Sequence, residues 1–141
     1  MGRILAIDYG TRRTGIAVTD PLRIIANALE TVPTHTLHAW LAGYLAAESV
    51  DIIVVGHPTA MDGSPSETMT QIEPLVRKLR ADHPARQVVM FDERFTSRLA
   101  LRAMIDGGVK KMARRDKALV DRLSATIILQ GYLESRQYKE L

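Results

Sequence analysis

The sequence of 141 residues has no cysteine and no long apolar run. Without cysteine, disulfide bonds and thiolate metal sites are excluded. No apolar run approaches the roughly 20 residues that a membrane-spanning helix needs, and the N-terminus enters a strand-like stretch almost at once, without the layout of a signal peptide. We therefore expect a cytoplasmic protein that does not enter a membrane, with a length that suits one domain over residues 1–141.

Positive charge is concentrated in one part of the chain. The net charge is only +3, but residues 102–122 hold seven basic residues against three acidic ones. Basic side chains gathered in this way are typical of proteins that bind the phosphates of nucleic acids. The candidates for phosphate contacts are Arg12, Arg13, Arg94, Lys110, Lys111, Arg114, Arg115 and Lys117.

Apolar patterning predicts an α/β fold. The expected strands cover residues 3–9, 14–19, 24–32, 51–56 and 87–91. The expected helices cover residues 35–48, 66–80, 96–107 and 116–134. This order predicts a five-stranded mixed sheet, in which a three-strand antiparallel meander is followed by alternating strands and helices, with helices on both faces. In such sheets, sites gather at the carboxyl ends of the parallel strands.

Three acidic residues stand where exposure to solvent does not explain them. Asp8 lies inside an apolar strand, and Asp121 lies on or beside the apolar face of the last helix. Glu93 follows the strand that ends at Phe91, and Asp92 competes with it for the same role. A carboxylate in an apolar setting needs an internal partner or a cation.

Carboxylates that converge from two strand ends and a helix suit Mg²⁺ or Mn²⁺, which prefer oxygen ligands. Two such ions can flank a phosphodiester, so the pattern favours a nuclease. The alternatives are structural. Asp8 would cap the turn at residues 10–13, Glu93 would pair with Arg94, and Asp121 would pair with Lys117 one helical turn away. For His57, packing in a loop is favoured over catalysis.

Four motifs together resemble the YqgF/RuvX family of pre-16S rRNA nucleases, also described as Holliday-junction-resolvase-like. They are AIDYGTRRTGIA at 6–17, VVGHP at 54–58 with DGS at 62–64, DERFTS at 92–97, and KALVD at 117–121 with SATIILQGYL at 124–133. The resemblance covers essentially the whole chain. It implies a ribonuclease H-like fold, metal-dependent phosphodiester hydrolysis, maturation of the 5′ end of 16S rRNA, and an acidic cluster at Asp8, Glu93 and Asp121.

Three other functions stay open at this point. A DNA junction resolvase would need a dimer that presents two sites to two strands. A non-catalytic module that binds nucleic acid would gain from losing carboxylates near phosphate. An actin-like phosphotransferase would need a second lobe to enclose ATP, for which 141 residues leave little room.

Overall fold

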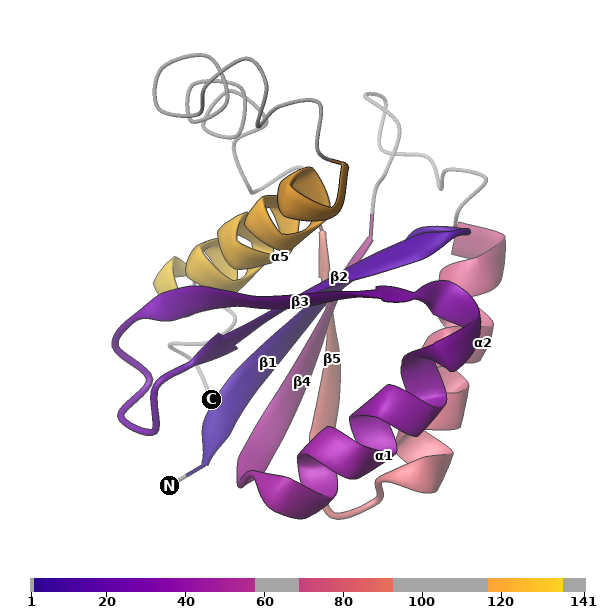
Figure 1. Cartoon of the computed structure of the whole chain (residues 1–141). Coiled ribbons are helices and arrows are strands. Elements are labelled where there is room, and N and C mark those ends of the chain that lie inside the picture. Colours follow the sequence, from indigo (N-terminus) through magenta and orange to yellow (C-terminus); the bar gives the residue numbers. More distant parts are fainter. Residues whose placement is uncertain (1, 58–68, 93–116, 136–141) are drawn as a thin grey trace.

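The computed structural model describes residues 2–57, 69–92 and 117–135 of the chain (Figure 1). Its elements are β1 (Arg3–Asp8), β2 (Arg13–Thr19), β3 (Ala26–Pro33), the 3₁₀ turn η1 (Thr34–Thr36), α1 (Leu37–Ala47), β4 (Val50–His57), α2 (Met69–Asp82), β5 (Gln87–Asp92) and α5 (Lys117–Glu134).

The five strands form one mixed sheet in the order β3-β2-β1-β4-β5. β2 pairs with both β1 and β3 in antiparallel orientation, whereas β4 pairs with both β1 and β5 in parallel. This confirms the predicted meander followed by parallel strands. β1 is the central strand, and its carboxyl end lies at the same edge as those of β4 and β5.

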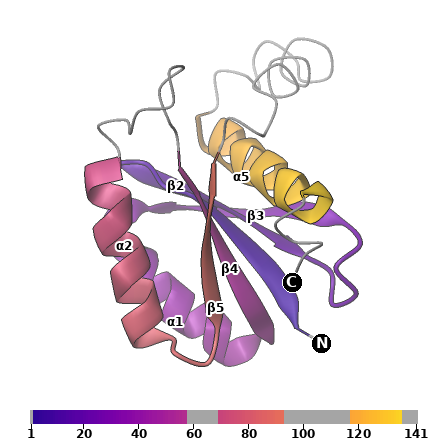
Figure 2. The same cartoon turned by 180° about the vertical axis from the view of Figure 1, so that it is seen from behind.

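Helices cover both faces of the sheet (Figures 1 and 2). On one face, α1 and α2 bury a cluster that includes Leu5 and Ile7 of β1. On the other, α5 buries a cluster that includes Ile4 and Ala6 of the same strand. Alternate residues of β1 therefore face different helices, as a period of two requires. Because both faces are covered, β1 and β4 read as continuous apolar runs.

Two predicted boundaries were displaced by local hydrogen bonds. The third strand begins at Ala26 rather than residue 24, because the Asp20 carboxylate accepts hydrogen bonds from the backbone N–H groups of residues 22, 24 and 25 in a loop. The first helix begins with a 3₁₀ turn and becomes α-helical only at Leu37. The helix expected over 96–107 and the basic stretch 109–115 lie outside the described residues.

No helix in the described ranges is long and apolar enough to cross a membrane.

Candidate active site

Asp8 is the last residue of β1, at the carboxyl edge of the sheet. It is half-buried, in contrast to the four fully buried residues that precede it. Because Ile4 and Ala6 belong to the cluster under α5, strand alternation directs Asp8 to the α5 face as well. Its neighbour across the antiparallel ladder is Gly15 of β2.

Gly15 brings α5 into contact with this edge. A Cβ atom at position 15 would collide with the backbone carbonyl oxygen of Asp121. The helix therefore lies directly on the backbone of β2, and a side chain at residue 15 would push it away. Since Gly15 pairs with Asp8 and touches Asp121, the fold brings these two acidic residues to one corner.

The Asp121 carboxylate is bound by a cation in the structure. Arg13 Nε donates a hydrogen bond of 2.9 Å to Asp121 Oδ2, and the two side chains are 41% and 23% exposed. Arg13 lies two residues before Gly15, on the same face of β2. Sequence spacing alone did not reveal this ion pair, and the alternative pair with Lys117 is not tested, because the Lys117 side chain lies outside the described residues.

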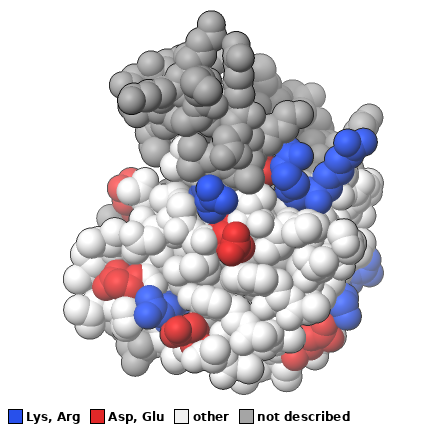
Figure 3. All heavy atoms as spheres, viewed as in Figure 1, with Lys and Arg blue, Asp and Glu red and all other residues white. Residues whose placement is uncertain are grey.

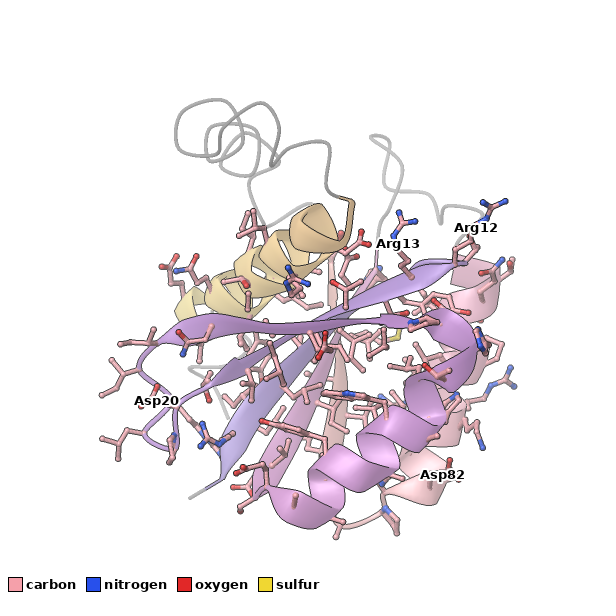
Figure 4. The ribbon with its side chains drawn as sticks, in the orientation of Figure 1. Arg12, Arg13, Asp20 and Asp82 are labelled. Carbon is pink, nitrogen blue, oxygen red and sulfur yellow. The ribbon has the colours of Figure 1, made fainter. Side chains whose placement is uncertain are left out.

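Arg12 and Arg13 project from the turn between β1 and β2 (Figure 4). Arg13 is directed toward α5, whereas Arg12 lies nearer the amino-terminal end of α2. Both are exposed. In the space-filling view, basic side chains gather at the upper right of the molecule with an acidic side chain beside them, while side chains of both signs are scattered over the rest of this face (Figure 3).

The carboxyl ends of β4 and β5 contribute His57 and Asp92, which are neighbours in the parallel register. Val88 and Met90 pack against the α1/α2 cluster, so alternation directs Asp92 to that face, away from Asp8. His57 lies on the same side as Asp92. Its Nδ1 is buried without a hydrogen-bond partner among the described residues. Because Glu93 lies outside the described residues, the choice between Asp92 and Glu93 stays a prediction.

Several predicted site residues fall outside the described residues. These are Glu93, Arg94, Lys110, Lys111, Arg114 and Arg115. Lys117 opens α5, but its side chain is not described. Within the described ranges, no three His, Asp or Glu residues form a metal-binding group. The described part of the predicted triad is thus the pair Asp8 and Asp121.

The donor set fits a divalent cation. Asp8 and Asp121 supply carboxylate oxygens, which are the ligands that Mg²⁺ and Mn²⁺ prefer. The guanidinium of Arg13, held by Asp121, already shows that a positive charge is accommodated at this corner. An additional carboxylate at residue 93 would complete the predicted set.

Known proteins resemble this chain over nearly its whole length. The family model RuvX, described as Holliday junction resolvase, matches residues 2–135. A protein of Phocaeicola vulgatus named "Putative pre-16S rRNA nuclease" is 58% identical over 98% of this chain and 99% of its own length. A protein of the same name from Bacteroides thetaiotaomicron is 55% identical over 98% of this chain and 100% of its own length.

Among solved structures, Thermus thermophilus RuvC in complex with a Holliday junction substrate superposes with a TM-score of 0.55. It is 17% identical and the alignment covers 94% of both chains. This likeness concerns the fold, which is ribonuclease H-like as the sequence motifs implied. With the family model matched over nearly all of its length, the chain belongs to the RuvX family.

Proposed function

We propose that this protein is a nuclease that hydrolyses phosphodiester bonds in precursor 16S rRNA with the help of Mg²⁺ or Mn²⁺. The proposal rests on one observation. Because residue 15 is glycine, α5 packs directly on the backbone of β2, and Asp121 therefore lies near Asp8. We infer the substrate from the names of relatives that are more than half identical to this chain. The proposal includes a cytoplasmic location, where bacterial rRNA precursors mature.

Asp8 and Asp121 would hold the cations together with Glu93. When bound, a pair of divalent ions activates a water molecule and stabilises the leaving oxygen of the phosphodiester. Asp8 is suited to this role because a half-buried strand end fixes its carboxylate. Asp121 stands on the first turns of a helix whose next turns, at Ala125, Ile128 and Tyr132, are fully or almost fully buried.

Arg13 would bind a phosphate of the substrate next to Asp8 and Asp121. Its ion pair with Asp121 joins partly exposed groups, and such pairs contribute at most about 1 kcal/mol. The guanidinium is therefore free to leave the carboxylate at little cost. A backbone phosphate, like a carboxylate, presents two oxygens that a guanidinium can bind with a pair of hydrogen bonds. Arg12 and the basic residues at 94 and 110–117 would extend this contact along the strand.

The decisive experiment compares cleavage of a 16S rRNA precursor by the wild type and by Asp8→Asn, Glu93→Gln and Asp121→Asn, each with Mn²⁺ and with EDTA. Each amide should lower the cleavage rate by about 100-fold or more, because the ions contribute several kcal/mol to the transition state. Circular dichroism and urea unfolding check that the folds match. Glu48→Gln is the control, since this exposed residue lies just before β4 begins, at the opposite end of the sheet from Asp8.

A DNA junction resolvase is the second candidate, because the matching family model carries that description. A parallel reaction with a four-way DNA junction separates the two. Cleavage of the junction in preference to the precursor would replace the RNA assignment. Binding of either nucleic acid without metal-dependent cleavage would instead identify a non-catalytic module.

A further inference from the structure

A cavity of about 430 Å³ lies beside the candidate active site, on the opposite face of the sheet. It is bounded by the turn after β1, by η1 and the start of α1, and by α2. Its lining includes Tyr9, Thr11, Leu37, His38, Gln71 and Lys78. No function described so far uses this cavity.

The turn at residues 10–13 connects the cavity to the acidic corner, the place where Asp8 and Asp121 lie. Asp8 is directed to the α5 face, and the next residue, Tyr9, packs against the cluster on the α1/α2 face. The chain then passes through Thr11, which lines the cavity, to Arg13, which binds Asp121. A nucleic-acid strand that crosses this turn would therefore meet both features within a few residues of protein.

Hydrogen bonds hold the wall of the cavity in shape. Thr34 Oγ1 donates to the carbonyl oxygen of Gly10 over 2.6 Å, and Thr34 N donates to that of Arg12 over 2.9 Å. The hydroxyls of Thr14 and Thr34 are also in contact at 2.9 Å. The turn at residues 10–13 is thereby fastened to η1. A cavity whose walls are fixed before binding loses less entropy when a ligand enters.

The lining chemistry matches one nucleotide of a single strand. Buried Leu37 and Leu75 form an apolar floor, and Tyr9 adds an aromatic ring. Single-stranded RNA is recognised by stacking of unpaired bases on such rings and by polar groups at the base edges. The amide of Gln71 is an exposed donor and acceptor. The volume lies within the range of about 300–1,000 Å³ of pockets that bind small ligands.

The charged groups of the cavity suit a phosphate at its rim. Lys78 is exposed and pairs with Asp82 over 3.1 Å in an i,i+4 arrangement. Such pairs contribute only about 0.3–0.5 kcal/mol, so a phosphate can replace Asp82. Burial lowers the pKa of His38, and the charge of Lys78 lowers it further against the opposing charge of Asp82, so the neutral imidazole is favoured. His38 therefore offers a ring rather than a second cation.

We propose that this cavity binds one unstacked nucleotide of the RNA strand whose neighbouring phosphodiester lies at Asp8 and Asp121, with the base against Tyr9 and Gln71 and a phosphate at Lys78. The inference rests on the proposed nuclease function, because it places the same strand in both features. It adds a requirement for unpaired RNA, which the acidic residues alone do not impose.

The test measures binding without cleavage. A fluorescein-labelled single-stranded RNA of 12 nucleotides is titrated in EDTA, and the titration is repeated with an abasic site at each inner position. Loss of the stacked base should weaken binding about tenfold at one or two adjacent positions and little elsewhere. Gln71→Trp, which fills the cavity, should remove this position dependence. Glu73→Trp is its control, because Glu73 is exposed on the same helix but does not line the cavity.

A second pair of variants tests the phosphate. Lys78→Ala should lower the slope of log K against log salt by about 0.7, the value for one contact to a single strand. Arg77→Ala removes an equal charge from an exposed position outside the cavity and should leave the slope unchanged. Equal changes in both variants, or no position dependence in the wild type, would overturn the proposal.

The two proposals fail in different ways. If the wild type cleaves precursor RNA with Mn²⁺ but binds every abasic RNA equally, the cavity is not a nucleotide site and the nuclease function stands. If it shows the position dependence but never cleaves, the nuclease assignment is wrong and the cavity remains a binding site for RNA.

Discussion

Acidic residues at the two ends of the central strands have different kinds of hydrogen-bond partner. We call these two ends the amino edge and the carboxyl edge of the sheet. At the amino edge of β1, Asp51 Oδ2 accepts a hydrogen bond from Gly2 N at 2.7 Å and pairs with Arg23 at 2.9 Å. Asp20 accepts hydrogen bonds from three backbone N–H groups. At the carboxyl edge, Asp121 binds the side chain of Arg13.

This difference separates structural carboxylates from those able to bind a ligand. Backbone N–H groups cannot leave a carboxylate unless the local fold opens. A long side chain such as that of Arg13 leaves by rotating about its own bonds. Acidic residues at the amino edge therefore stabilise loops, whereas Asp121 can exchange its partner for a cation. Substitutions at the amino edge should therefore change the stability of the fold, whereas substitutions at the carboxyl edge should change the affinity for metal.

The largest effect is expected from Gly15→Ala. The new methyl group would collide with the backbone of Asp121, so α5 must shift away from β2. Overpacking of this kind typically costs about 1–3 kcal/mol, and the displaced Asp121 should also lose cleavage activity. Urea unfolding at 25 °C and the cleavage assay measure the two effects.

Gly43→Ala is the matched control for this substitution. Gly43 lies in α1, and a Cβ there would meet no atom within 4 Å. Alanine should stabilise the helix by about 0.5–1 kcal/mol and leave cleavage unchanged. If the Gly15→Ala protein is as stable and active as the Gly43→Ala protein, the contact between Gly15 and the backbone of Asp121 does not fix the position of α5.

A smaller effect, confined to stability, is expected from Asp20→Ala. Hydrogen bonds from the backbone of Ile25, and then Ile24 and Leu22, lower the pKa of Asp20 in the folded protein. A lowered folded-state pKa adds stability above the unfolded pKa of about 3.9, and this stability is lost as the pH falls through the folded pKa.

The wild type should therefore be more stable than Asp20→Ala at pH 7, and the difference should shrink below about pH 4. Urea midpoints at both pH values provide the measurement, and RNA cleavage at pH 7 should persist because the loop lies at the other edge. A difference that stays constant with pH would mean that the charge of Asp20 does not hold the loop.

The smallest change in stability is expected from Arg13→Gln. Its ion pair is partly exposed, so the loss should stay below about 1 kcal/mol. Without the competing guanidinium, however, Asp121 should bind Mn²⁺ more tightly in the absence of RNA. Isothermal titration with Mn²⁺ detects this change.

Arg23→Gln is the counterpart at the amino edge. Arg23 is 13% exposed, pairs with Asp51 and donates to the carbonyl oxygen of Gly2. This substitution should cost more stability than Arg13→Gln and leave Mn²⁺ affinity unaltered. Weaker Mn²⁺ binding in Arg13→Gln would contradict the exchange of partners at Asp121.

Sequence patterning predicted the sheet and its helices because apolar residues repeat with the period of each element. It also placed Asp121 correctly beside Ala125, Ile128 and Tyr132, which are buried. It could not predict the Arg13–Asp121 pair, since the two residues are 108 positions apart. The role of Gly15 was missed as well. A glycine inside a strand was the available signal, because it often marks a close backbone approach.

The central position of β1 has a consequence for how the chain is made. Residues 3–33 can pair as a hairpin and a third strand, but β4, the other neighbour of β1, begins only at Val50. Until β4 emerges during synthesis, the apolar strand β1 has one open hydrogen-bonding edge, which is a template for aggregation. Slowing translation after β3 has emerged from the ribosome but before β4 has emerged should therefore lower the soluble yield more than slowing it after β5 has emerged.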